Sequence, residues 1–250
     1  MQQVIPARQR RDRRLQHTMQ ATWGKAPGRR LNQDDRPVHQ RMDPVSPSAS
    51  LLQTMTTTET IAAPTRSQRL KAATSTTHDS LDKRIMSEDI FASRERFAKF
   101  VRVQYRFHRD IQALYATPLL RALLPDLEQR QRLQQIVADL GDLQQDVPAD
   151  SAAVIPDDIE LPQALGWLYV AEGSNLGGTI LFKLAGKLGL GAAFGASHLA
   201  AHPDGAARHW REFTASLDGI SMTEAQEAAA IEGANAAFRT VRGYVEQEFA

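Results

Sequence analysis

Three glycines stand close together in one apolar stretch of the chain: Gly173, Gly177 and Gly178. A glycine inside a helix costs about 1 kcal/mol relative to alanine, so the cluster needs a reason. Gly173 and Gly177 are four residues apart and share one helical face, where a ledge without side chains would suit a flat ligand. Alternatively, the glycines let two helices pack closely, or the segment is two helices and a loop. No strand pattern precedes them, which argues against a Walker loop or a dinucleotide fingerprint.

Histidine is the second residue type that could do chemistry here. The chain has seven histidines and no cysteine, so a metal would be held by histidine, carboxylate or solvent. His78 lies between Thr74 and Leu81 on a helical face that is otherwise apolar or small. A lone histidine there is either a hydrogen-bonded core residue or a metal ligand. We expect the others to be solvated, paired or polar surface, with no nearby carboxylate to complete a triad at His198 and His202; these others are His17, His39, His108, His198, His202 and His209.

Charge divides the chain into two parts. Residues 1–54 carry ten Lys and Arg against four Asp and Glu, a net charge of +6, whereas the rest carries twenty against twenty-five. Residues 1–64 are polar and lack a hydrophobic period, so we predict a disordered basic extension, with Met55 as a plausible alternative start. Residues 65–250 are predicted to form one domain, long enough to bury a core and too acidic to favour nucleic acid.

The elements that must position these residues are predicted to be helices. Apolar residues recur with helical spacing from Ser67 onward, so the fold class is all-α. No apolar run is long enough to span a bilayer and no secretory signal is present, so we expect a cytoplasmic protein without a membrane anchor. The predicted helices are 67–86, 91–115, one from Pro118, 125–140, 161–189, 206–217 and 223–249, with Ser87 as an N-cap, Gly141 as a helix end and a capping box of Thr223 and Gln226.

Two stretches of the chain together resemble the haem (heme) oxygenases, particularly the bacterial ones. Residues 70–82, LKAATSTTHDSLD, are similar to the family's first helix with its proximal histidine. Residues 166–178, GWLYVAEGSNLGG, are similar to its kinked distal helix. The intervening residues 91–97, FASRERF, and the pair Gln104-Tyr105 also look like the bacterial branch. The resemblance covers residues 68–250.

The resemblance implies a single helical domain in which haem b lies between the helix of His78 and the helix of Gly173–Gly178. His78 would be the axial ligand of the haem iron, and the glycines would bring the backbone close to bound O2. Haem would be both cofactor and substrate, opened with O2 and electrons to biliverdin, CO and ferrous iron. A neutral histidine suits this reaction, because a thiolate would promote O–O cleavage.

Further residues would supply protons and orient the haem. Many animal relatives have an aspartate directly after the first glycine, where this chain has Ser174, so water held by backbone carbonyls and Ser174 would deliver the protons. Lys71, two turns before His78, could pair with a propionate, as could the hydroxyl of Tyr169. Relatives with Lys and Tyr in these places resemble those that cut at the α position, so we expect mainly α cleavage. Thr74 shares the face of His78 and is counted among the haem-binding residues.

Two other functions fit the same residues. A haem carrier, store or sensor would share His78 and the glycine ledge but would leave haem intact. A helical protein without haem would use His78 in its core and the glycines for packing. The sequence has no flavin or iron–sulfur motif, so an oxygenase would take its electrons from an external partner protein or a small reductant. The resemblance favours a monomer.

Overall fold

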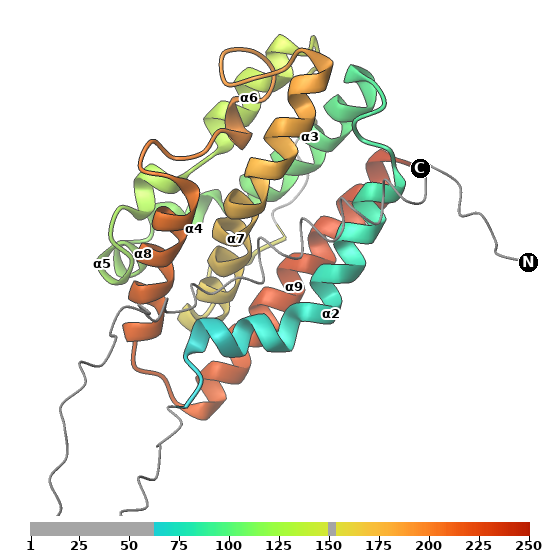
Figure 1. The fold of residues 1–250 in the computed structure, drawn as a ribbon. Helices are drawn as coiled ribbons and strands as arrows, with labels where there is room; N and C mark the ends of the chain where they lie inside the picture. The colour runs from blue at the N-terminus through green and yellow to red at the C-terminus, as the bar shows by residue number, and fades with distance from the viewer. Residues whose placement is uncertain (1–62, 150–153) are drawn as a thin grey trace, which may run out of the picture.

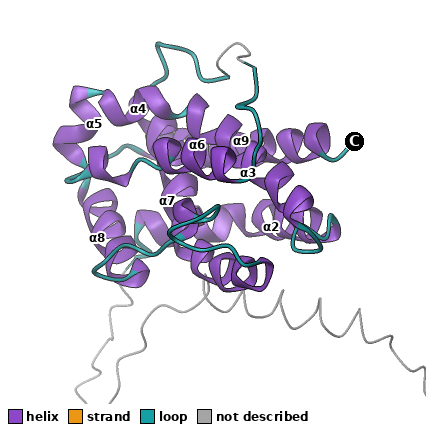
Figure 2. Cartoon of the chain, turned by 90° about the horizontal axis from the view of Figure 1, so that it is seen from above, coloured by secondary structure: helices purple, strands orange, loops and turns teal. Residues whose placement is uncertain are grey.

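The computed structural model describes residues 63–149 and 154–250, and the regular elements of that part of the chain are helices. Figure 2 shows them as helices joined by loops, with α7 in the middle of the others. The α-helices are α2 (Arg66–Ser87), α3 (Arg94–Asp110), α4 (Gln112–Ala116), α5 (Pro118–Leu123), α6 (Leu133–Asp142), α7 (Leu161–Ala185), α8 (Ala206–Gly219) and α9 (Glu224–Glu248). Short 3-10 helices are η1 (Leu127–Arg130), η2 (Gly186–Leu188) and η3 (Ser197–Leu199). The predicted all-α class is confirmed.

The predicted N-terminal extension lies outside the described residues, except for its last two positions. The expectations for Met55, His17 and His39 therefore stay predictions. No helix among the described residues is long and apolar enough to cross a membrane.

Several predicted helix ends were wrong, and the local backbone explains why. Ser87 is the last residue of α2, and Ser93 caps α3 by accepting a hydrogen bond from the Arg96 backbone. Asp89 lies between them at φ 48°, a left-handed conformation that interrupts a helix. The predicted helix 91–115 is divided into α3 and α4, and 125–140 into η1 and α6. Gly141 does not stop α6, which ends one residue later.

The first turn of α2 is firmly fixed, and this sets the position of the whole helix that carries His78. Thr65 forms a capping box with Gln68. The buried Arg66 guanidinium donates to the carbonyl oxygen of Ile220 at 2.6 Å, to that of Leu217, and to the Glu227 carboxylate at 2.8 Å. These partners lie at the end of α8, in the turn that follows it and at the start of α9, so α2 is tied to both helices where it begins.

Helices α7 and α9 lie close together at their first halves (Figure 1), where their backbones are in contact. A Cβ atom on Gly166 would lie 2.1 Å from the Ala230 carbonyl oxygen, and one on Gly233 would lie 2.3 Å from that of Gln163. No side chain fits at either position. Close packing between these two helices is thus found at Gly166 and Gly233, outside the glycine cluster. The predicted capping box of Thr223 and Gln226 at the start of α9 is confirmed.

Two hydrophobic clusters fill the interior of the described helices. The larger lies around α7 and α9 and includes Trp167, Phe213 and Phe238. The smaller lies around α3 and α6 and includes Phe97 and Phe100. Burial of these side chains is the main source of stability. The space between the two clusters is incompletely filled, and the candidate site is found there.

Candidate functional site

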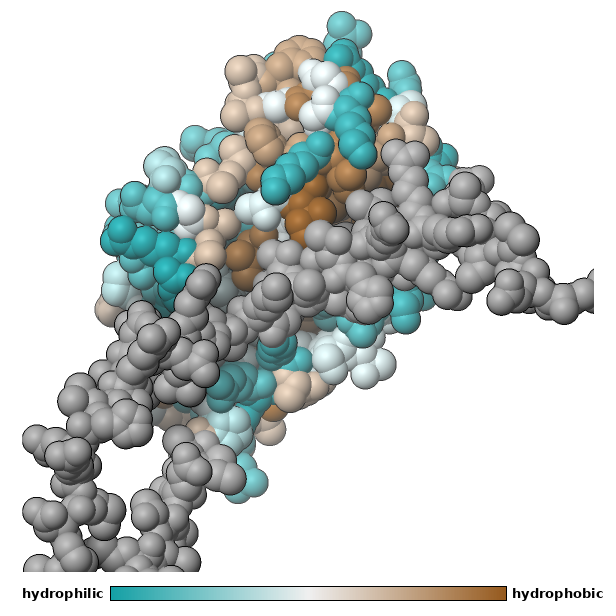
Figure 3. All heavy atoms as spheres, in the orientation of Figure 1, coloured by the Kyte–Doolittle hydropathy of each residue, from teal (hydrophilic) through white to brown (hydrophobic). Residues whose placement is uncertain are grey.

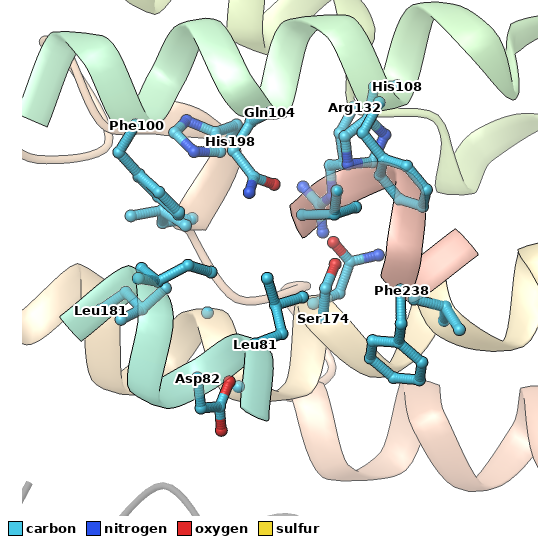
Figure 4. Close-up of a pocket in the computed structure, with 18 of the residues that line it drawn as sticks. Leu81, Asp82, Phe100, Gln104, His108, Arg132, Ser174, Leu181, His198 and Phe238 are labelled. Atoms are coloured by element: carbon cyan, nitrogen blue, oxygen red, sulfur yellow. The ribbon is translucent and has the colours of Figure 1, made fainter. Parts of the chain in front are cut away.

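A cavity lies among α2, α3, α7 and α9, with the η3 segment closing one end (Figure 4). It contains about 990 Å³ of empty space, part of it open to solvent. Figure 3 shows hydrophobic side chains gathered between α7 and α2 on this face of the molecule. Its apolar lining is Leu81, Ile85, Phe100, Phe107, Val170, Leu181, Leu199, Phe238 and Val241; its other lining residues are His78, Asp82, Gln104, His108, Arg132, Ser174, Asn175, Gly177, Gly178 and His198.

His78 lines this cavity from α2, as the apolar face around it predicted. Its ring makes an edge contact with Phe238, at 5.5 Å between ring centroids. Its Nδ1 lies 3.6 Å from a carboxylate oxygen of Asp82, one turn further along the helix. Burial raises the pKa of Asp82, while the neighbouring His78 opposes this rise. A carboxylate beside one ring nitrogen commonly orients a histidine whose other nitrogen binds a metal.

The glycine cluster forms part of the cavity wall on α7. This helix runs through Gly173, Gly177 and Gly178 without interruption, so the alternative of two helices and a loop is wrong. A Cβ on Gly177 would meet nothing within 4 Å, and one on Gly178 would only touch Leu199, at 3.6 Å. These two glycines border the cavity, whereas Gly173 is buried and is not part of the lining. Packing does not require glycine at 177, so the space beside it is available to a ligand.

Ser174 lies between the glycines and borders the cavity (Figure 4). Its hydroxyl donates a hydrogen bond to the Ala171 carbonyl oxygen at 2.7 Å. Because the hydroxyl proton already makes this hydrogen bond, the Ser174 oxygen can only accept hydrogen bonds from a ligand or water.

The three remaining predicted haem-binding residues lie outside the cavity lining. The Thr74 side chain is buried and donates to the Leu70 carbonyl oxygen at 2.8 Å. Tyr169 is 1% exposed and packs against Trp210, with ring centroids 5.4 Å apart. Burial, together with the Asp218 carboxylate, raises the pKa of the Tyr169 phenol above its usual range. Lys71 is half-buried, in the first half of α2.

Sequence reasoning missed a polar corner of the cavity. Its members are Gln104 and His108 from α3, Arg132 before α6, and Asn175 from α7 (Figure 4 labels the first three). His108 was expected to be solvated or paired, but it is 3% exposed. Burial, with the charges of His198 and Arg132, lowers its pKa from 6.5 to about 3, so the ring is a neutral hydrogen-bonding group. The signal was present in the sequence, because Phe100, Gln104, Phe107 and His108 recur at helical spacing on one face.

His198 completes this corner and is held by a carboxylate, contrary to expectation. Asp139 is 0% exposed and accepts hydrogen bonds from the backbone of Ser197 at 2.7 Å and of His198 at 2.9 Å. Its oxygen also lies 2.6 Å from Nδ1 of the His198 ring. Burial alone would raise the pKa of Asp139, but the ring and backbone hydrogen bonds of His198 outweigh it and hold the pKa below its usual value. This carboxylate fixes the orientation of the ring through Nδ1 and leaves Nε2 buried without a partner among the described residues.

The three loop histidines were expected at the surface, and two of them are buried. His198 is 5% exposed and His209 is 8% exposed. His202 does not pair with His198; its ring stacks on that of His209 at 4.3 Å and 8°. The described residues contain no group of three or more His, Asp and Glu suited to hold a metal ion.

The arrangement suits a flat, largely apolar ligand that carries its own metal. One histidine faces the cavity from α2, aromatic and aliphatic side chains surround it, and the α7 wall has no side chain at Gly177. Buried polar atoms without a protein partner among the described residues, such as His198 Nε2 and His108 Nδ1, are available to water on the polar side.

Comparison with known proteins agrees with this geometry. A model of the family described as heme oxygenase matches residues 65–247. The chain is 44% identical over 185 residues to heme oxygenase PigA of Pseudomonas aeruginosa, covering 74% of this chain and 93% of that protein. It also resembles the crystal structures of NO- and CO-bound heme oxygenase from Neisseria meningitidis, at TM-score 0.71 and 40% identity, covering 75% and 93% of the two chains. Heme oxygenase-1 of Synechocystis in complex with heme matches at TM-score 0.58 and 17% identity, covering 74% and 92%, which shows the shared fold alone.

Proposed function

The chain belongs to the haem oxygenase family and is a haem-binding enzyme of haem breakdown, and we propose that the reaction takes place in the cavity between α2 and α7. His78 is the proposed axial ligand, through Nε2, with Nδ1 turned to Asp82. The observation that carries this assignment is that His78 and Gly177 border the same cavity, although 99 positions separate them in the sequence. When bound there, haem is opened by O2 and electrons to biliverdin, CO and ferrous iron.

The residues around the haem have separate tasks in this proposal. The wall at Gly177 and Gly178 leaves room for O2 beside the backbone. The polar corner holds water: Gln104 and Arg132 offer N–H donors, the oriented His198 offers the ring nitrogen Nε2, and neutral His108 offers one donor and one acceptor. Ser174 adds an acceptor. Water held in this corner delivers the protons that the reaction consumes, which replaces a side-chain acid at position 174.

We further propose cleavage at the α-meso position, set by the propionates. Asp218 accepts hydrogen bonds from the backbone and the hydroxyl of Ser67, at 2.7 and 2.9 Å, and it also acts on Tyr169. The first turn of α2 and Tyr169 therefore meet around one carboxylate. Lys71 lies one turn beyond Ser67 on the same face. In this proposal Lys71 and Tyr169 lie beyond the cavity lining at the end of the haem that carries the propionates, and the ammonium of Lys71 reaches one of them.

The proposal also includes an external electron donor, a monomeric enzyme and a cytoplasmic location. The donor is a partner protein or a small reductant. The test is to mix the protein with haemin, supply a reductase system in air, and separate the products by chromatography. Loss of the Soret band with α-biliverdin as the main isomer supports the proposal. A β/δ mixture contradicts the propionate assignment, and an oxy spectrum that persists contradicts turnover and favours a haem carrier.

Lys71 is tested by Lys71→Gln, a variant without the ammonium. The expected result is a larger share of non-α isomers with the Soret spectrum of the haem complex unchanged. Lys83→Gln, at an exposed position of the same helix, is the matched control and should leave the isomer ratio unchanged. An unchanged ratio in Lys71→Gln would remove Lys71 from the haem-orienting residues.

A further inference from the structure

A buried ion pair lies behind the α7 wall of the cavity. Nη1 of Arg130 donates to Oε2 of Glu172 at 2.9 Å, and the two side chains are 3% and 1% exposed. The same Nη1 donates to the backbone carbonyl oxygen of His209 at 3.3 Å. Burying two charges carries a large desolvation penalty, and an apolar pair of the same size would usually serve stability as well. A role beyond stability is therefore worth seeking.

Buried polar atoms without a partner among the described residues gather around this ion pair. They are Oε1 of Glu172, Nε of Arg130, the Tyr115 hydroxyl oxygen and Nδ2 of Asn175. Burial raises the pKa of the Tyr115 phenol, and the charge of Glu172 raises it further. Burial also raises the pKa of Glu172, and the side chain of Asn175 opposes this rise, so these groups are neighbours. Buried groups of this kind normally bind ordered water. The cluster thus offers donors and acceptors for a short chain of hydrogen bonds.

One end of the cluster reaches the cavity. Asn175 follows Glu172 by three residues on the same side of α7 and lines the cavity. Arg132 also lines the cavity, and its charge acts on Glu172. Burial raises the pKa of the Glu172 carboxyl, and Arg130 opposes this rise. Glu172 is therefore a buried carboxyl that does not line the cavity itself but neighbours two residues that do, Asn175 and Arg132.

The other end of the cluster reaches the surface. His209, whose carbonyl accepts from Arg130, is 8% exposed, and its ring stacks on that of His202. The His202 side chain is 33% exposed. Burial, with the charges of Arg130 and His202, lowers the pKa of His209 to about 4. Polar groups therefore lie between solvent at His202 and the cavity at Asn175: the rings of His202 and His209 stack, the backbone carbonyl of His209 accepts from Arg130, and Arg130 pairs with Glu172.

We propose that this file of groups is the route by which protons enter the oxygen side of the cavity, with Glu172 as the group that passes them on. The inference rests on the proposed function, because it requires O2 to react beside α7. A proton arrives from solvent on ordered water from the side of His202 and His209 and binds the Glu172 carboxylate at Oε1, while Arg130 stays protonated and holds Oε2. The proton then leaves to water held by Asn175, and the carboxylate returns to its starting charge. No electron moves in these steps.

Glu172→Gln tests the route, because it keeps the size and hydrogen bonding of the side chain but cannot carry the proton. In the haem complex, turnover under saturating reductant should fall by about tenfold or more, and the solvent deuterium isotope effect should rise. The midpoint of the acid–alkaline transition of the ferric complex, followed by absorbance, should move to lower pH by on the order of one unit, because a negative charge near the cavity is lost. Glu172→Asp, which keeps the carboxylate, should recover part of the rate.

Glu248→Gln is the matched control. Glu248 pairs with Arg102 and Arg106 at 2.8 Å, its side chain is 8% exposed, and it does not line the cavity. The variant removes the same charge from another buried Arg–Glu pair, and it should change neither the transition midpoint nor the isotope effect. If Glu172→Gln does not fold, the variant Arg130→Met with Glu172→Gln removes both charges and leaves no unpaired arginine.

Two results would overturn the proposal. One is wild-type turnover and isotope effect in folded Glu172→Gln. The other is equal changes in Glu172→Gln and Glu248→Gln, which would make the ion pair structural only. Failure of the wild-type protein itself to open haem would instead contradict the proposed function, so the two failures are distinguishable.

Discussion

Because His108 is neutral in the folded protein, acid should weaken the fold through this one residue by a predictable amount. Burial lowers its pKa from 6.5 to about 3, whereas the imidazole of the unfolded chain keeps its ordinary value. A group whose pKa is lower in the folded state stabilises the fold above its unfolded pKa. That stability is lost as the pH falls from 6.5 towards the folded value.

The magnitude follows from the two pKa values. At pH 5 the unfolded chain has taken up nearly one proton at this position, while the folded protein has taken up almost none. The lost stability at pH 5 is about 2 kcal/mol, from 1.5 pH units at about 1.4 kcal/mol each. In His108→Gln the titrating group is absent. The variant should be less stable than the wild type at pH 7, and the difference should shrink by about 2 kcal/mol at pH 5.

The assay is urea unfolding of both proteins without haem at pH 7 and pH 5, followed by tryptophan fluorescence. An equal slope of the unfolding free energy against urea concentration in the two proteins shows that both expose the same surface on unfolding. Other acid-sensitive groups, such as His209 and Asp139, titrate in both proteins and cancel in the difference. A stability difference that is the same at both pH values would refute the burial and neutrality of His108.

The remaining predictions concern backbone contacts and the Asp139 carboxylate. Gly166→Ala should lower the free energy of unfolding by more than about 2 kcal/mol, because its Cβ would lie 2.1 Å from the Ala230 carbonyl oxygen, whereas Gly177→Ala has open space and should raise it by up to about 1 kcal/mol. Equal effects of the two in denaturant unfolding would contradict the assigned contacts. Asp139→Asn should cost about 2–4 kcal/mol at pH 7, since an amide cannot keep all three hydrogen bonds. In the wild type, the contribution of the Asp139 carboxylate should be lost as the pH falls from the ordinary Asp pKa of about 4 through its lowered value in the folded protein. An Asp139→Asn variant as stable as the wild type at pH 7 would contradict this.

Local patterns predicted the helices and the two walls of the cavity well. Helical periodicity located α2, α7 and α9. The three clustered glycines around Gly177 marked α7 as a helix with a function beyond packing. Helix ends were less predictable, because they depend on backbone conformations such as the left-handed Asp89 and Asp126, which ordinary residue types do not reveal.

The polar corner shows what sequence alone could not supply. His198 and Asp139 are 59 positions apart, and only the packing of η3 on α6 brings them together. Arg130 in η1 and Glu172 in α7 are 42 positions apart and likewise meet only through tertiary packing. Tyr169 lies one turn from the glycines, yet its side chain packs against Trp210 outside the cavity lining, which helical spacing alone does not reveal. Helical spacing identifies a face, and the tertiary contacts decide what that face meets.

The most direct test of the central claim is haem turnover in His78→Ala, with and without added imidazole. The account predicts that the wild type loses its Soret band in air with reductant and yields biliverdin. The variant should lose the histidine-ligated spectrum and the turnover, and imidazole should restore both, because the cavity keeps its walls. A variant that keeps the wild-type spectrum and turnover without imidazole would contradict the assignment of His78 and of the cavity it faces.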